Sequence, residues 1–163
     1  MPAPDVLVVG AGIVGAACAA EAAEAGLSVR VLESRFAGGG ATAAAMGHIV
    51  VMDDSPAQFA LTELSRRLWT ELAPSLPASC EDEQTGTLWV ASDDEELAHV
   101  RGKAAFYRQR GVAVDELDAA GLAAAEPNLR PGLAGALRVP GDRVLYPVNA
   151  ARWLLERAAA LTG

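Results

Sequence analysis

The hydrophobic positions at the start of the chain fall into two short runs, separated by a glycine-rich stretch and an alanine-rich stretch. Residues 6–9 read Val-Leu-Val-Val, a run without alternation that predicts a strand covered on both faces, as in a parallel sheet. Residues 13–25 are rich in alanine and predict a helix that Gly26 ends. Residues 28–32 predict a second strand. The pattern therefore predicts a strand–helix–strand (βαβ) unit with parallel strands.

A row of leucines at helical spacing predicts a longer helix further along. The capping-box pattern of residues 55–58 precedes the row, and Pro74 follows it. We expect this helix to pack its leucine face against a sheet. The row consists of Leu61, Leu64, Leu68 and Leu72.

The second half of the chain predicts a mixed set of elements. They are a strand at 87–91, a helix at 93–110, a short helix at 115–125, a strand at 136–139 and a last helix from Pro147. The expected fold class is α/β: a Rossmann-like βαβ core with an inserted α+β lobe. The expected segments are 1–76 for the first part of the core domain, 77–140 for the lobe, and 141–163 for the return to the core domain.

The net charge of the chain argues against nucleic acids and anionic membranes as partners. The 163 residues carry a formal net charge of −8, which repels nucleic-acid phosphates and anionic lipid head groups. The longest apolar run, residues 6–20, is too short and too rich in glycine to span a membrane. Asp5 precedes that run where a secretory signal has a basic residue, so we expect a cytoplasmic protein without a transmembrane segment.

The sequence offers little for a disulfide framework or a metal site. Cys18 lies in the predicted alanine-rich helix and Cys80 in a polar loop, and neither CxxC nor HExxH occurs. His48 and His99 are the only histidines. We therefore expect no bound metal.

The pattern with the most chemical content is Gly10-Ala11-Gly12-Ile13-Val14-Gly15, a GxGxxG between a predicted strand and a predicted helix. The first glycine permits a tight turn, the second lets a pyrophosphate approach the backbone, and the third lets the helix lie close to the strands. The N-terminus of the helix then attracts the phosphate charge. In this context the motif predicts a dinucleotide site.

Glu33, at the end of the second predicted strand, completes the fingerprint. A carboxylate there can accept hydrogen bonds from the two hydroxyls of an adenosine ribose, and it repels a 2′-phosphate. The residues thus favour FAD or NAD over NADP, and they leave the choice between FAD and NAD open.

Three stretches after the second strand, residues 33–35, 38–42 and 46–49, resemble the D-amino acid oxidase (DAO) superfamily of FAD-dependent oxidoreductases. That superfamily includes glycine oxidase, sarcosine oxidase and D-amino acid dehydrogenases. The nearest subgroup, judged by residues 41–54 and by Tyr146-Pro147, is the D-hydroxyproline dehydrogenase-like one. The resemblance covers the amino-terminal part of the family and implies an FAD-binding domain with an inserted substrate-binding lobe.

The resemblance also implies which residues contact FAD. Besides the glycine motif, they are Glu33, Ser34, Ala41, Thr42, Met46, Gly47 and His48. Gly47 would let the backbone approach a flat ring closely. His48 is either a direct flavin contact or an ordinary hydrogen-bonded residue at the start of a strand, and both interpretations stay open.

For function, the resemblance implies an enzyme that oxidises the C–N bond of a D-amino acid or secondary amine by hydride transfer to flavin N5. Glycine, sarcosine and D-proline or D-hydroxyproline are the expected kinds of substrate. In relatives the substrate-binding arginine and a tyrosine lie in the second half of the chain, so we expect the catalytic residues beyond Gly163 and an incomplete, inactive fragment. The alternatives are an NAD-dependent oxidoreductase and a non-catalytic dinucleotide-binding subunit. A partner subunit and the electron acceptor are not identified.

Overall fold

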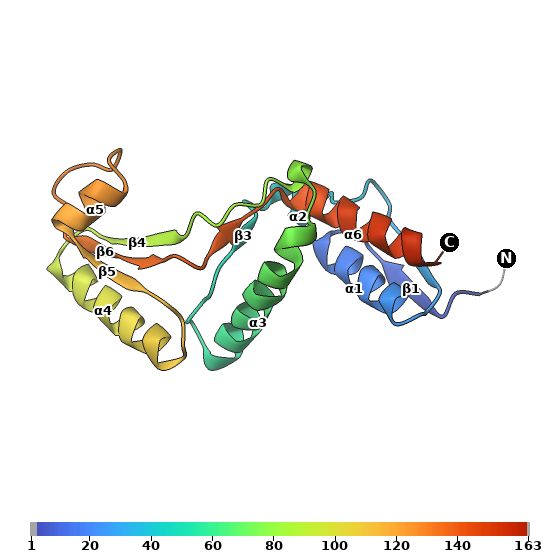
Figure 1. Ribbon diagram of the computed structural model, residues 1–163, viewed down its shortest axis with the longest axis horizontal. Helices are drawn as coiled ribbons and strands as arrows, with labels where there is room; N and C mark the ends of the chain where they lie inside the picture. The colour runs from blue at the N-terminus through green and yellow to red at the C-terminus, as the bar shows by residue number, and fades with distance from the viewer. Residues whose placement is uncertain (1–2, 163) are drawn as a thin grey trace. The chain divides into compact units, whose positions relative to one another are not determined.

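A computed structural model describes residues 3–162 of the chain, which forms two compact units. Unit 1 is Met1–His48, Thr70–Asp82 and Val144–Gly163, and unit 2 is Ile49–Trp69 and Glu83–Arg143. The expected segments 1–76 and 141–163 include residues 1–2 and 163, which lie outside the described residues. Figure 1 labels the elements of both units.

Unit 1 begins with the predicted βαβ arrangement. Strand β1 (Val6–Val9) is followed by helix α1 (Ile13–Glu24) and strand β2 (Val29–Leu32). The two strands pair in parallel, from Val6 opposite Val29 to Val9 opposite Leu32. Gly26 stands just past the end of α1 with φ of +80°, a conformation that glycine adopts without a Cβ penalty. The expected Rossmann-like start of the chain is confirmed.

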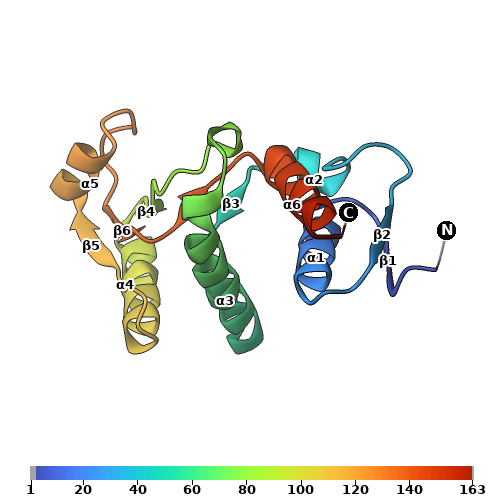
Figure 2. The same cartoon turned by 45° about the vertical axis from the view of Figure 1, so that its right-hand side comes forward.

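Helix α6 (Pro147–Thr162) lies beside α1, as Figure 2 shows. The two helices meet through small buried side chains, Ala19 and Ala23 on α1 and Ala158 on α6, which allow close approach. Arg157 and Glu24 form an ion pair between the same helices. The alanine-rich composition of α1 thus serves a contact between helices whose touching residues are more than 130 positions apart in sequence.

The sheet of unit 1 is covered on one face, whereas the sequence predicts cover on both. Val8, Val29 and Val31 pack towards α1 and α6. On the other face Val9 is 81% exposed, and Leu7 and Leu32 are exposed too. Successive side chains of a strand point to opposite faces, and α1 and α6 cover only one of them.

The stretch from Ser34 to Ala45 contains a short helix, α2 (Ala41–Ala44). Two-residue strands follow at β3 (His48–Ile49) and β7 (Arg143–Val144), which pair with each other. The 3-10 turns η1 (Ala73–Ser75) and η2 (Ala78–Cys80) complete unit 1.

Unit 2 contains a three-stranded antiparallel sheet in the order β4-β6-β5. The strands are β4 (Thr87–Ala91), β5 (Asp115–Asp118) and β6 (Gly135–Val139). Helix α4 (Asp94–Gln109) matches the predicted helix, and the Asp93 carboxylate caps it by accepting from the Glu96 N–H at 2.9 Å.

The expected helix over 115–125 is wrong for its first four residues. They form β5, and only Ala119–Ala125 is helical, as α5. Strand β5 pairs with β6 from Asp115 opposite Arg138 to Asp118 opposite Gly135. The Asp118 carboxylate accepts from the Gly121 N–H at 2.8 Å and thereby starts α5 four residues later than expected.

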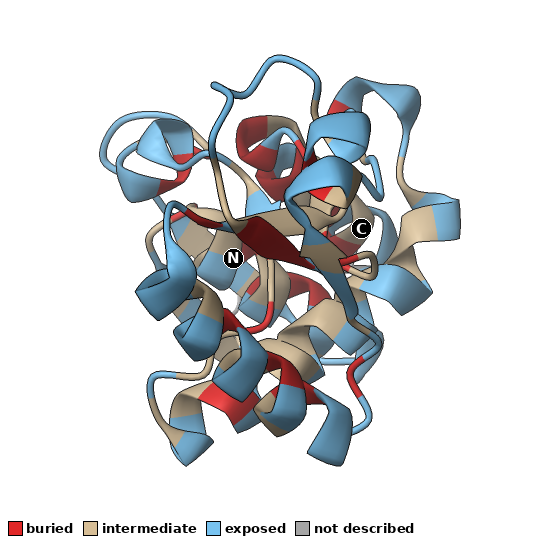
Figure 3. Cartoon of the chain, turned by 90° about the vertical axis from the view of Figure 1, so that its left-hand side faces the viewer, coloured by how far each residue is buried: buried red, intermediate tan, exposed pale blue. Residues whose placement is uncertain are grey.

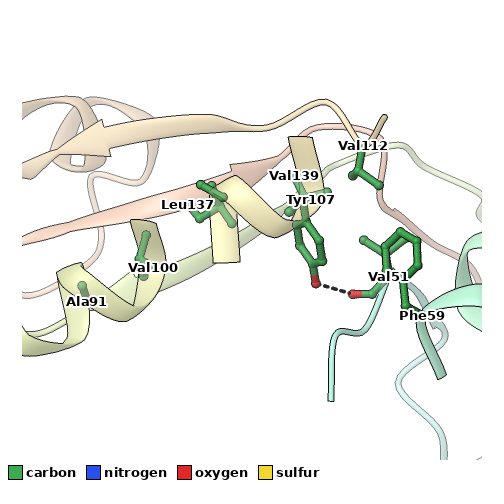
Figure 4. Close-up of a cluster of buried hydrophobic side chains, with 9 residues drawn as sticks. Val51, Phe59, Ala91, Val100, Tyr107, Val112, Leu137 and Val139 are labelled. Carbon is green, nitrogen blue, oxygen red and sulfur yellow. Dashed lines mark hydrogen bonds between the residues drawn. The ribbon is translucent and has the colours of Figure 1, made fainter. Parts of the chain in front are cut away.

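The core of unit 2 gathers around Tyr107 of α4 (Figure 4). Tyr107 and Leu137 are fully buried, and Phe59 packs against Tyr107 with ring centroids 6.2 Å apart. Val51 and Phe59 belong to this core. For that reason residues 49–69 cluster with unit 2, although the sequence analysis groups them with the glycine motif.

Helix α3 (Pro56–Leu72) starts as predicted, with the Gln58 N–H donating to Ser55 Oγ at 3.2 Å. Its leucine face does not pack as expected: Leu61 is 68% exposed, and Leu64 and Leu68 are exposed as well. Phe59 supplies the buried contact of this helix instead. Figure 3, coloured by burial, shows helices that alternate between buried and exposed residues along their length.

Candidate functional site

The glycine motif forms a tight turn between β1 and α1. Gly10 has φ of +103°, and its N–H donates to the Leu32 carbonyl at 2.7 Å, so the turn is fixed to the end of β2. A Cβ on Gly15 would overlap the Gly10 carbonyl oxygen. The first and last glycines are therefore needed by the fold itself, before any ligand is considered.

The N-terminus of helix α1 faces this turn without a side-chain cap from its own N-cap residue. The helix begins directly after Gly12, which has no side chain to cap it, and its first turn contains no acidic residue. The backbone N–H groups there and the positive end of the helix dipole favour an anion.

Thr42, from α2, is brought to the same helix end. Its Oγ1 accepts a hydrogen bond from the Ile13 N–H at 3.0 Å, and the residue is 7% exposed. A Cβ on Gly12 would lie 3.0 Å from the same Oγ1. Because the hydroxyl accepts from Ile13, its own proton stays available for donation to a ligand oxygen.

Glu33 lies at the end of β2 and contacts the glycine turn directly. Its Oε2 accepts from the Ala11 N–H at 2.9 Å and its Oε1 accepts from the Arg35 N–H at 2.9 Å. These two hydrogen bonds, first that of Ala11 and then that of Arg35, lower the pKa of the Glu33 carboxyl. The carboxylate is thus ionised at neutral pH. Because Oε1 also accepts from Ser34 Oγ at 3.4 Å, Oε2 is the oxygen that retains a lone pair for a further donor.

Gly38 lies in the stretch 38–42 that carries the family resemblance, and the structure places it at the glycine turn although it was not among the predicted cofactor contacts. Its N–H donates to the Ala11 carbonyl at 2.8 Å, and with φ of +78° it lies against Val148. This contact folds the loop after β2 back over the glycine turn. The three consecutive glycines at 38–40 are the sequence signal that could have indicated it.

The structure thus joins the glycine motif, Glu33 and Thr42 through hydrogen bonds, and places the other predicted residues around them. Ser34 is exposed beside Glu33, and Ala41 is exposed next to Thr42. Met46 is 77% exposed and His48 is exposed.

Gly47 has a role in the fold that the sequence did not indicate. With φ of +75°, its carbonyl accepts from the Leu145 N–H at 3.0 Å, and a Cβ would overlap the Leu145 oxygen. Glycine is thus required here by the Leu145 backbone. The expected approach of Gly47 to a flat ring stays a prediction.

Residues 3–162 contain neither a metal-binding cluster nor a membrane-spanning helix. In residues 3–162, no group of three or more His, Cys, Asp and Glu side chains is arranged to hold a metal ion. Over the same residues, none of the helices has the length and apolar character needed to cross a membrane.

Comparison with protein families gives one match over nearly the whole chain. Residues 5–163 match the family described as DAO, FAD dependent oxidoreductase. Among curated proteins, glycine oxidase of Geobacillus kaustophilus is 30% identical over 164 residues, 96% of this chain and 44% of its own length. The D-amino acid dehydrogenase of Granulibacter bethesdensis is 32% identical over 107 residues, 61% of this chain and 26% of its own length.

Solved structures show the same relationship. The crystal structure of glycine oxidase from Geobacillus kaustophilus superposes with a TM-score of 0.87 at 30% identity, over 98% of this chain and 45% of that one. L-proline dehydrogenase from P. horikoshii gives a TM-score of 0.84 at 25% identity, over 96% of this chain and 41% of that one. The chain therefore spans less than half the length of these proteins.

Proposed function

Because the chain belongs to the DAO family of FAD dependent oxidoreductases, we propose that it supplies the dinucleotide-binding part of an enzyme that oxidises the C–N bond of an amino acid or secondary amine. The observation that carries this proposal is the hydrogen-bonded group of glycine turn, Glu33 and Thr42 at the N-terminus of α1.

The residues present fit the ADP part of FAD. Gly12 leaves the helix end open where a Cβ would meet Thr42 Oγ1, and the N-terminus of α1 attracts the pyrophosphate. Thr42 can donate its hydroxyl proton to a phosphate oxygen while it accepts from Ile13. Glu33 can accept from a ribose hydroxyl with the Oε2 lone pair that Ala11 leaves unused, and a ribose hydroxyl can replace Ser34 at Oε1.

The other proposed contacts lie along the chain after α2. Ala41 and Ser34 border the pyrophosphate and ribose positions, and Met46, Gly47 and His48 are proposed to lie near the flavin ring. The exposed His48 side chain is available to donate a hydrogen bond to a flavin carbonyl.

When bound, FAD accepts the hydride that leaves the substrate carbon next to nitrogen. The proposed substrates are D-amino acids and secondary amines of the glycine, sarcosine and D-proline or D-hydroxyproline type. Relatives named glycine oxidase and D-amino acid dehydrogenase support this class.

The net charge and the two cysteines bear on the partner and the compartment of the protein. The net charge of −8 suits a small-molecule substrate better than a nucleic acid. Both cysteines, Cys18 and Cys80, are free thiols, which suits a reducing compartment, and we place the enzyme in the cytoplasm.

The test is the flavin content and reducibility of the purified full-length enzyme, because the catalytic residues are expected beyond Gly163. We expect a yellow protein whose absorption bleaches, in the absence of oxygen, with D-proline, D-hydroxyproline, sarcosine or glycine, and not with the L-enantiomers of the chiral compounds. A protein that remains colourless after incubation with FAD would contradict the proposal. Flavin that binds and is reduced by no amine would favour a non-catalytic dinucleotide-binding subunit.

A further inference from the structure

Residues 51–53, which follow β3, have no regular secondary structure and are nevertheless anchored at every residue. Val51 is fully buried, and Met52 and Asp53 are half-buried. Backbone polar groups in such a segment need partners from elsewhere, because no ladder or helix supplies them. Here the partners come from side chains of α3 and α4.

Tyr107 of α4 holds the first of these residues. Its hydroxyl donates to the Val51 carbonyl at 3.0 Å, and Figure 4 shows the ring reaching from the helix to that carbonyl. Burial, followed by the charges of Asp53, Asp142 and Asp54, raises the pKa of Tyr107. The hydroxyl therefore keeps its proton and remains a donor.

Thr62 of α3 holds the second residue. Its Oγ1 accepts from the Met52 N–H at 3.0 Å and donates to the Gln58 carbonyl at 2.9 Å. The hydroxyl thus connects Met52 to the backbone of α3.

Lys103, one helical turn before Tyr107, holds the third. Its ammonium group forms an ion pair with Asp53 and lies 3.4 Å from the Tyr107 hydroxyl. It also lies 4.1 Å from the centroid of the Trp89 ring, a cation–π distance. A lysine side chain held by three groups has lost most of its freedom, so Asp53 is held in turn.

On the other side of β3, the Gly47 carbonyl accepts from the Leu145 N–H. Only residues 48–50 separate this anchor from Val51, and a chain of that length spans at most roughly 3.6 Å per residue. His48 therefore lies, in sequence, between two anchored positions, Gly47 and Val51.

We propose that Tyr107 and Lys103 are positioning residues for His48: by fixing the backbone of residues 51–53, they fix where the chain leaves β3. The inference rests on the proposed function, in which Met46, Gly47 and His48 lie near the flavin ring. Neither Tyr107 nor Lys103 touches the cofactor in this proposal, and both act through the backbone.

The test compares Tyr107→Phe with Arg108→Gln. The first removes the hydroxyl that binds Val51. The second is a matched control on the same helix, because it breaks the exposed Arg108–Glu116 ion pair and leaves residues 51–53 untouched.

Hydrogen exchange of the purified protein gives the first measurement. In Tyr107→Phe we expect the amides of residues 50–53 to exchange about tenfold faster, as loss of one buried hydrogen bond implies, while Arg108→Gln stays within about twofold of the wild type. Unchanged exchange in Tyr107→Phe overturns the inference. Where that variant does not fold, Lys103→Met keeps the Tyr107–Val51 bond and is judged by exchange around Asp53.

The flavin spectrum gives the second measurement. In the full-length enzyme we expect Tyr107→Phe to retain FAD, because the glycine turn is unchanged, and to show a shifted visible flavin band and about tenfold slower reduction by substrate. Faster exchange with an unaltered flavin spectrum and reduction rate would leave Tyr107 a purely structural residue and overturn the inference. A wild-type protein that binds no FAD would overturn the proposed function, and the exchange measurement would still report on residues 50–53.

Discussion

The carboxylate of Glu33 accepts a hydrogen bond from the backbone N–H of Ala11 over 2.9 Å, and this contact joins the end of β2 to the glycine turn after β1. The residue proposed to bind the ribose thus also holds the turn that is proposed to receive the pyrophosphate. Part of the proposed cofactor site is therefore already arranged in the protein alone, which would reduce the ordering required on binding.

Replacing Glu33 with Gln tests this double role. Gln offers one acceptor oxygen where the carboxylate uses two, so one of the bonds from Ala11 and Arg35 is lost along with the charge. Because hydrogen bonds to charged groups are stronger than those between neutral groups, we expect FAD affinity to fall by roughly tenfold or more. A fluorescence titration measures it, with Glu21→Gln on the exposed side of α1 as the control.

Glu33 also predicts a dependence of stability on pH. Its pKa in the folded chain is lowered, first by the Ala11 hydrogen bond and then by that of Arg35. Its contribution is therefore present above the ordinary glutamate pKa of about 4.3 and is lost as pH falls through the lowered value. Urea midpoints of wild type and Glu33→Gln should differ at pH 7 and converge below pH ~4. A difference that stayed constant down to pH ~2.5 would contradict this assignment.

Gly12→Val should abolish FAD retention, because the new side chain would fill the space beside Thr42 Oγ1 and block the helix N-terminus. The matched control is Gly102→Val on α4, where a Cβ meets nothing within 4 Å. The flavin-to-protein absorbance ratio of the two purified variants decides the matter. Equal flavin content in both would overturn the assignment of Gly12 to the pyrophosphate.

Thr42→Val should destabilise the chain by about 1 kcal/mol, since the Ile13 N–H loses its acceptor at the start of α1. Thr42→Ser keeps the hydroxyl and should recover most of the loss. Urea unfolding without cofactor measures both variants. Equal stability of the valine and serine variants would show that the hydroxyl does not cap the helix.

Replacing two leucines of unit 2 by Ala should change the free energy of unfolding by very different amounts. Leu137 is fully buried in the core around Tyr107, and its replacement by Ala should cost about 2–5 kcal/mol. Leu61, exposed on α3, should change stability by less than about 0.5 kcal/mol when replaced by Ala. Urea denaturation of the two variants checks the burial of each side chain, and a large loss at Leu61 would show that the leucine face of α3 is covered in solution.

Local rules predict much of this fold. Helix α4 runs from its Asp93 cap to Arg110 because the capping carboxylate and the spacing of apolar residues indicate the same element. These rules do not predict strand β5. Its sequence, Asp-Glu-Leu-Asp, has no strand pattern, and it is extended because β6 pairs with it. The exposed leucines of α3 show that periodicity locates an apolar face and leaves its packing undetermined.

The same division applies to the candidate site. Spacing alone brings out the glycine motif and Glu33, because a βαβ unit places both at one end of parallel strands. Gly38 contacts Ala11, and Tyr107 contacts Val51. No sequence motif relates the members of either pair, so the sequence does not predict these contacts. Only the folded chain shows them.

The contact between Gly47 and Leu145 has a consequence for the order of events during synthesis. At ~5–20 residues per second, about 100 residues take roughly 5 to 20 seconds to follow Gly47 out of the ribosome. Until then α1 cannot pack against α6. Its alanine face therefore stays exposed to water, and only the βαβ unit holds the glycine turn. Meanwhile the residues of unit 2 emerge in full. We therefore expect unit 2 to fold before unit 1 packs α1 against α6.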